Sequence, residues 1–307
     1  MGARHFGVGA ETTYGTAVTP TRFFEALSES VQTEPEYEAI EVIRGYSTRE
    51  MALLRKLVRG DVEILANYHG IGLLYQHLIG SVTTTTGSVN THTFPASTGI
   101  PAADRIGLGL TGEFRRDGSL VWTYAGMKIT GLSHSFGTDQ SSRMSMTFLA
   151  STETTGTSST TATYSTLAPM KPSHVSVNMS GSNVSATSAT ITIDNPLDEP
   201  FGLGSTAMIA EPDRSGVLKV TGSAELLFTT WTQYNYFSAG SDVDIYVIAT
   251  DTTYSVRYNF DKSRITRMTP HMSGRERLKC TVDWEAFYNS DATENCQIVL
   301  VNSDSTA

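Results

Sequence analysis

The pattern of apolar and polar residues is repeated in two segments of the chain. Leu120–Ala150 and Val256–Ala286 each alternate apolar and polar positions on both sides of a turn-rich stretch, and they align at a constant offset of 136 residues. Alternation with a period of two is typical of a β-strand with one buried face. Each segment therefore predicts two or three antiparallel strands. The coinciding apolar positions are Trp122 and Tyr258, Tyr124 and Phe260, Ile129 and Ile265, Leu132 and Met268, Met144 and Cys280, Met146 and Val282, Phe148 and Trp284, and Ala150 and Ala286.

A second matched pair lies upstream of these segments. Val58–Leu65 aligns with Val220–Leu227 at an offset of 162 residues. In both copies the residues that follow carry apolar side chains at spacings of three and four, which predicts short helices over His69–Ile79 and Trp231–Ala239. The order strand, helix, loop and strand pair therefore occurs twice. This order indicates a tandem duplication of a domain of roughly 130 residues.

The duplication predicts how the chain is divided. We expect an N-terminal arm over residues 1–30, a first domain over 31–152, a Ser/Thr-rich linker over 153–170 and a second domain over 171–307. The abundance of Thr, Ser, Val and Gly favours a mainly β fold, with one short helix flanking each domain.

Two segments have no match in the other copy. Arg44–Lys56 is predicted to be a charged loop with apolar residues, and Ser81–Gly107 is predicted to be a long loop or hairpin. Apolar residues without a local core cover the parent domain or, in an oligomer, pack on a neighbouring chain. We therefore expect contacts between chains in these two segments. Glu63 and Glu225 occupy matching positions in the two copies, and they are either interface residues or ordinary exposed strand residues. The interface candidates are Arg44, Tyr46, Arg49, Met51, Leu53, Leu54, Arg55, His92 and Phe94.

Composition narrows the class of protein. The 307 residues carry a formal net charge of −9 and have a pI near 5.3, which argues against a protein that grips nucleic acid through its phosphates. No apolar run approaches the roughly 20 residues of a membrane helix, so no membrane anchor is expected. Two cysteines do not make a disulfide framework, and Cys280 occupies an apolar strand position typical of a buried thiol.

Candidate chemistry is weak along the whole sequence. The GVGA fragment at Gly7–Ala10 lacks the flanking strand and helix of a nucleotide fingerprint. His69 and His77 lie on the first predicted helix, but the matching residues of the second copy are not histidines, so helix-surface residues are favoured over a metal pair. Asp242 and Asp244 lack the glycine and distal glutamate of a calcium loop. No catalytic, cofactor-binding or metal-binding residue is predicted, and an enzyme is not expected.

Four segments carry a resemblance to a known family. They are Gly7–Ser30 (GVGAETTYGTAVTPTRFFEALSES), Gly60–Gly80 (GDVEILANYHGIGLLYQHLIG), Ile129–Ser151 (ITGLSHSFGTDQSSRMSMTFLAS) and Ile191–Asp198 (ITIDNPLD). In this order they resemble tail tube proteins of long-tailed bacteriophages, over nearly the whole chain. The resemblance implies two tandem β-sandwich or half-barrel domains, each flanked by a helix.

The resemblance also implies assembly. Single-domain relatives form rings of six copies whose inner sheets join as one barrel, so a doubled domain implies a ring of three chains with pseudo-sixfold symmetry. Stacked rings would surround a channel for double-stranded DNA in transit, without specific binding, and Glu63 and Glu225 become candidate lumen or interface carboxylates. The implied partners are other copies of the chain, a tape measure protein, a tail terminator and tail-tip proteins. The implied location is the virion tail, after synthesis in the host cytoplasm.

Two alternatives remain open at this stage. Thr-rich strands also occur in extracellular β-sandwich adhesins and carbohydrate-binding modules, although no predicted loop has clustered aromatic residues and no secretion signal is visible. An enzyme is the third hypothesis, and the sequence offers it no acid–base or nucleophile constellation.

Overall fold

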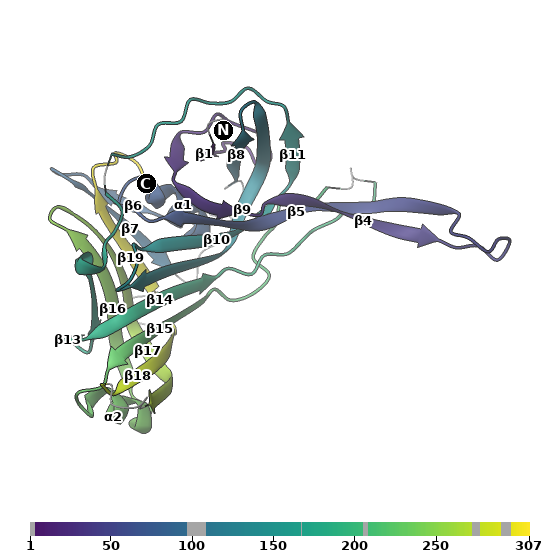
Figure 1. Cartoon of the computed structure of the whole chain (residues 1–307). Helices are drawn as coiled ribbons and strands as arrows, with labels where there is room; N and C mark the ends of the chain where they lie inside the picture. Colours follow the sequence, from purple (N-terminus) through teal and green to yellow (C-terminus); the bar gives the residue numbers. More distant parts are fainter. Residues whose placement is uncertain (1–3, 97–108, 167, 205–207, 272–276, 290–295) are drawn as a thin grey trace.

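Antiparallel β-sheet dominates the structure, a computed structural model that describes residues 4–96, 109–166, 168–204, 208–271, 277–289 and 296–307 (Figure 1). The first half contains β1 (His5–Ala10), β2 (Arg22–Phe24), β3 (Ala26–Glu29), β4 (Gln32–Ile40), β5 (Glu50–Leu65), α1 (Ile71–Ile79), β6 (Thr83–Thr85), β7 (Asn90–Ala96), β8 (Leu110–Asp117), β9 (Leu120–Gly137), β10 (Arg143–Ala150) and β11 (Thr152–Thr155). The second half contains a 3-10 turn (Pro172–His174), β12 (Val175–Met179), β13 (Ser182–Val184), β14 (Ala186–Asp194), β15 (Lys219–Leu227), α2 (Thr232–Ala239), β16 (Asp242–Asp251), β17 (Tyr254–His271), β18 (Lys279–Ala286) and β19 (Cys296–Asn302). The predicted mainly β fold and the two short helices are confirmed.

The duplicated pattern corresponds to a duplicated strand register. β10 lies between β5 and β9, and β18 lies between β15 and β17. Ile64 faces Met144 in the first copy, and the residues at the predicted offsets, Leu226 and Cys280, face each other in the second. Because shifting a strand by one residue would move every side chain to the opposite face, identical registers mean identical core faces.

A β-bulge is also repeated at the same place. The register of β9 against β10 shifts next to Thr130, and the register of β17 against β18 shifts next to Thr266. The Thr130 hydroxyl donates to the carbonyl of Thr147, and the Thr266 hydroxyl donates to the carbonyl of Asp283, both at 3.2 Å. A bulge bends its strand and increases the local twist, so both copies curve at equivalent points.

Each copy also places a glycine opposite a large aromatic residue. Gly60 pairs with Phe148, and Gly222 pairs with Trp284. A Cβ on Gly222 would lie within 2.2 Å of the Trp284 ring atoms, so the indole fills the space that a side chain would occupy.

The two copies are joined into one continuous sheet by β14. This strand pairs with β15 of its own copy on one side and with the C-terminal half of β9 from the first copy on the other. The resulting sheet has the order β4, β5, β10, β9, β14, β15, β18, β17. Both copies therefore belong to one large antiparallel sheet.

The core beneath this sheet links the two copies by a buried polar chain. Nδ1 of His134 on β9 is hydrogen-bonded to the Tyr258 hydroxyl of β17 at 2.6 Å, and Nε2 of the same ring lies 2.7 Å from the Ser142 hydroxyl. The Tyr258 hydroxyl also lies 2.6 Å from that of Tyr75 on α1. Burial lowers the pKa of His134 to about 3 and raises those of both tyrosines, so all three are held uncharged.

The structure differs from the expected division in three places. The described part of the expected arm, residues 4–30, is not separate from the body, because β1 pairs with β2 and β8 and buries Phe6 and Val8. Ser81–Gly107 contributes the hairpin β6–β7, and β7 pairs with β19, so an insertion of the first copy extends the sheet of the second. Positions 97–108 lie outside the described residues. Arg44–Lys56 is not only a loop, because its last seven residues belong to β5, which pairs with β4 in a long two-stranded arm (Figure 1).

Candidate assembly surfaces and polar sheet face

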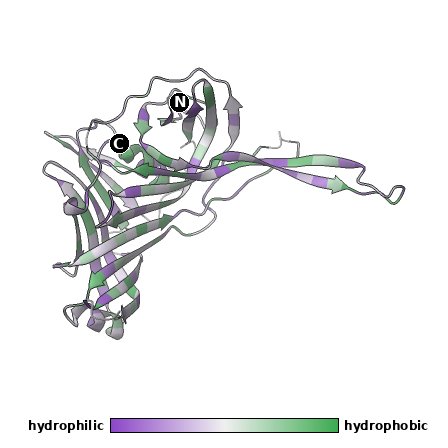
Figure 2. Ribbon diagram, in the orientation of Figure 1, coloured by the Kyte–Doolittle hydropathy of each residue, from purple (hydrophilic) through white to green (hydrophobic). Residues whose placement is uncertain are grey.

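One face of the eight-strand sheet packs on the core and the other is polar. Along β15, Val220, Ala224 and Leu226 are buried, whereas the intervening Thr221, Ser223 and Glu225 are half-buried and point to the opposite side. Figure 2 shows the same alternation of hydrophilic and hydrophobic residues in many of the strands. The period-two pattern of the sequence therefore produces a polar surface that follows the curvature of the sheet.

Cations on this polar face have carboxylate partners on neighbouring strands. The predicted Glu63 lies 3.4 Å from Arg143, and the predicted Glu225 lies 3.1 Å from Lys279. Because Lys279 follows Arg143 by the repeat offset, the ion pair is itself duplicated. The other pairs are Arg59 with Glu34, Lys219 with Glu285, Arg267 with Asp283, and Arg264 with Asp242.

These pairs matter more for the charge of the face than for stability. The side chains of Glu63, Arg143, Glu225 and Lys279 are between 30% and 39% exposed. Ion pairs at such positions contribute only about 0–1 kcal/mol. Their consequence is that each cation is already neutralised by a neighbour, which leaves little unpaired positive charge to hold a phosphate.

The eight-strand sheet ends in two open edges. β14 is paired on both sides, but its counterparts in the first copy, β3 and β4, pair only with β5 within the described chain. Likewise, residues 265–271 at the end of β17 pair with β18 alone, although the counterpart in β9 pairs on both sides. Such edges carry unpaired backbone N–H and C=O groups that can pair with another chain.

The β4–β5 arm extends beyond the body of the molecule and carries exposed apolar residues (Figure 1). Tyr46 at its tip is fully exposed, and Met51 and Leu54 are 59% and 51% exposed. Seven of the predicted interface residues lie on this arm, where no core of their own covers them. They are Arg44, Tyr46, Arg49, Met51, Leu53, Leu54 and Arg55.

His92 and Phe94, the other two interface candidates, are fully buried inside the chain. His92 lies 2.9 Å from the Thr84 hydroxyl and 3.1 Å from the Asn302 side chain, and the Phe94 ring packs edge-on against Tyr75. Both residues stabilise the junction of β7 with β19, and they offer no surface to another chain. The prediction for these two residues was wrong, because a strand that completes a sheet and a strand of a free hairpin have the same alternation of apolar and polar residues.

The residues considered for chemistry have structural partners. Gly7–Ala10 lies inside β1, His69 binds Asp304 at 2.8 Å, and His77 is buried on α1. Asp242 binds Arg264, whose hydrogen bond and charge lower the pKa of that carboxyl. Cys280 is a free buried thiol, and burial raises its pKa. Among the described residues, no group of three His, Cys, Asp or Glu side chains is placed to hold a metal ion.

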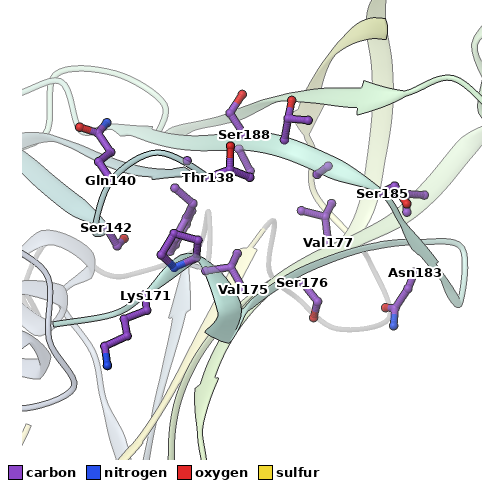
Figure 3. Close-up of a pocket in the computed structure, with 17 residues that line it drawn as sticks. Thr138, Gln140, Ser142, Lys171, Val175, Ser176, Val177, Asn183, Ser185 and Ser188 are labelled. Atoms are coloured by element: carbon purple, nitrogen blue, oxygen red, sulfur yellow. The ribbon is translucent and has the colours of Figure 1, made fainter. Parts of the chain in front are cut away.

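A cavity of about 280 Å³ lies between the end of β9 and the strands β12 to β14 (Figure 3). Its walls provide mostly hydroxyl, amide and aliphatic groups, from residues such as Gln140, Val175, Asn183 and Ser188. Figure 3 shows Lys171 extending away from the other side chains. Ser142 lines this cavity and its hydroxyl lies 2.7 Å from Nε2 of His134, but burial lowers the pKa of that imidazole to about 3, which makes it a weak base.

Two comparisons with known proteins bear on the family of the chain. The model of the phage tail tube protein family matches residues 3–286. The search of curated proteins found no match. In the described part of the chain, no helix has the length and hydropathy needed to span a membrane. Since the family match covers nearly the whole sequence, and the fold is the mainly β fold expected for it, the chain belongs to the phage tail tube protein family.

Proposed function

We propose that this chain is the structural subunit of a bacteriophage tail tube, and that its rings stack around a channel through which DNA is ejected. The observation that carries the proposal is the continuous curved sheet, polar on one face and open at both edges. Closing several such sheets into one barrel removes every open edge. The chain acts in the virion tail, and other tail proteins (tape measure, terminator and tip) are its further partners.

Three chains form each ring in this proposal. One chain supplies two copies of the domain, with nearly the same registers and in tandem in one sheet. A barrel of six domains therefore needs three chains and has pseudo-sixfold symmetry. Mass measurement of isolated rings should give three times 33.2 kDa. A mass of six chains would contradict the trimer.

The polar face of the sheet lines the channel. This face carries Ser, Thr, carboxylates and cations that are already paired, as expected for a wall that stays close to DNA without binding it. The exposed apolar residues of the β4–β5 arm contact the adjacent ring or chain, because an isolated subunit has no core to cover them.

Negative-stain electron microscopy of the purified protein tests the proposal. Rings or hollow tubes are expected, in particular at high protein concentration. Monodisperse monomers under all assembly conditions, including in the presence of the other tail proteins, would overturn it. Monomers that bind glycans would instead favour an adhesin or a carbohydrate-binding module.

A further inference from the structure

The seam between the two copies of the domain has a defined register. β14 pairs antiparallel with β9, with Asp194 opposite Gly131 and Thr192 opposite Ser133. The backbone amide of Asn195 donates to the carbonyl of Thr130 at 2.8 Å, so Asn195 and Thr130 form a hydrogen-bonded pair. Because such pairs alternate with non-hydrogen-bonded ones, the pair of Thr192 with Ser133 is of the second kind.

Both strands of this seam have counterparts with a free edge. β14 corresponds to β3–β4, since the bulge between Ala186 and Ser188 recurs between Ala26 and Ser28, 160 positions earlier. The C-terminal half of β9 corresponds to that of β17, 136 positions later. The two free edges lie at opposite ends of the eight-strand sheet, so one chain cannot pair them with each other (Figure 1).

We infer that the seam between neighbouring chains repeats the seam inside the chain. Strand β4 of one copy pairs antiparallel with β17 of the next, and the two offsets place Gln32 opposite Thr269, Thr33 opposite Met268 and Glu34 opposite Arg267. This inference rests on the proposed ring assembly and adds the partner strand and its register.

The chemistry of the two edges fits this register. Gln32 and Thr269 are both polar and exposed, and they correspond to the polar, half-buried Thr192 and Ser133 on the polar side of the internal seam. Glu34 and Arg267 bring opposite charges together at the next pair on the same face. The edges also differ in charge, because β4 carries three glutamates and no cation, whereas the part of β17 beyond its pairing with β16, residues 265–270, carries Arg267 and no carboxylate. Complementary edges favour this pairing over pairing of two like edges.

Two prolines stand at the outer edges where the internal seam has hydrogen-bond donors. Pro35 takes the place of Asn195, whose amide donates across the internal seam. Pro270 takes the place of His134, whose amide points toward β14 in the same alternation. Proline is tolerated in a strand where its nitrogen faces outward, and it reduces indiscriminate pairing of an open edge. The seam between chains therefore has two donors fewer than the internal one, and a free subunit is protected until a matching edge is present.

Disulfide crosslinking tests the register. The double variant Gln32→Cys with Thr269→Cys places two cysteines at a non-hydrogen-bonded pair, where Cα atoms are about 4.5 Å apart and a disulfide can form. The matched control, Glu34→Cys with Thr269→Cys, moves one cysteine by two residues on the same face, to a separation of about 7–8 Å that exceeds disulfide reach. The native Cys280 and Cys296 are buried and contribute little background.

Tubes of the first variant should yield covalent species up to a trimer on a non-reducing gel, at least about tenfold more than tubes of the control. The same variant in dilute, unassembled form should yield monomer only. Tubes that form normally but crosslink in the control variant, or in neither variant, would refute the register and leave the proposed function intact.

If the double variant fails to assemble, the substitutions Glu34→Arg and Arg267→Glu serve instead. Each of them should weaken assembly alone, and the two combined in one chain should restore it. Absence of restoration would also refute the register, whereas failure of the unmodified chain to form rings or tubes would overturn the proposed function.

Discussion

Removing the duplicated carboxylates should turn the polar face into a DNA-binding surface. The double substitution Glu63→Gln with Glu225→Gln leaves Arg143 and Lys279 without their partners, and these cations are already 39% and 36% exposed. Two cations are freed in each chain, which makes six in each proposed ring of three. Since exposed ion pairs contribute only about 0–1 kcal/mol, the variant should still fold and assemble.

The magnitude follows from counterion release. Each phosphate neutralised by a freed cation adds about 0.9 to the slope of log affinity against log salt, so a fourfold change in salt alters binding about 3.5-fold per contact. Six contacts per ring, repeated along a tube, would hold the DNA strongly at low salt. We expect slow ejection that accelerates with salt concentration.

The assay is DNA ejection from virions that carry the variant chain, triggered in vitro and followed at several salt concentrations. The matched control is Glu36→Gln, which frees Arg55 farther out on the arm, where its guanidinium lies over the Phe201 ring. The control should eject DNA at the wild-type rate if the arm does not reach the channel. Normal tubes with unchanged, salt-independent ejection in the double variant would refute the assignment of this face to the channel.

Three further predictions concern stability and assembly. In the folded chain the pKa of the buried His134 is about 3, whereas the unfolded chain binds a proton there near pH 6.5. The free energy of unfolding should therefore fall by about 1.4 kcal/mol per pH unit as the pH drops from about 6.5 to about 3. Urea titrations should show a shallower pH dependence of stability in His134→Gln, and an equal slope in both chains would contradict this. Gly222→Ala should destabilise the chain by about 1–3 kcal/mol, measured by thermal unfolding, because the new methyl group meets Trp284, whereas a neutral result would show that the indole moves freely. Replacing the arm tip between Ile40 and Glu50 by an Asn-Gly turn should leave a folded subunit but no tubes, as judged by circular dichroism and electron microscopy, and normal tubes would remove the arm from assembly.

The elements that the sequence predicts are those set by local periodicity. Leu120–Ala150 and Val256–Ala286 form the expected strand pairs because alternation is a property of neighbouring residues, and even the register follows from the two offsets. α1 and α2 begin within two residues of the predicted helices because glycine or turn residues bound both apolar stretches.

What the sequence does not reveal is which strands meet across long separations. The alternation in Thr91–Ala96 predicts a hairpin strand, but pairing with β19 depends on residues about 200 positions later. Deleting Ser81–Gly107 should therefore destabilise the subunit, because the deletion removes Phe94 from the core and leaves β19 paired on one side only, with β17. The hydrogen-bonded chain of Tyr75, Tyr258 and His134 cannot be predicted from local patterns either, because these residues come from three distant segments.

The differences between the two copies follow from the covalent link between them. The internal seam forms within one folding chain, at a high effective concentration, and can therefore use groups that require exact placement. Asn195 donates from its side chain to the Ile129 carbonyl at 2.8 Å, and the buried Lys128 binds Glu211 at 2.8 Å in the loop that replaces the arm in the second copy. In the proposed ring, the open edges stay unpaired until another chain arrives, and the corresponding positions carry Pro35 on β4 and Arg264, which binds Asp242 of its own chain. A duplication that first gave two equal seams would diverge in this direction, because one seam is selected for stability and the other for pairing only with the correct partner.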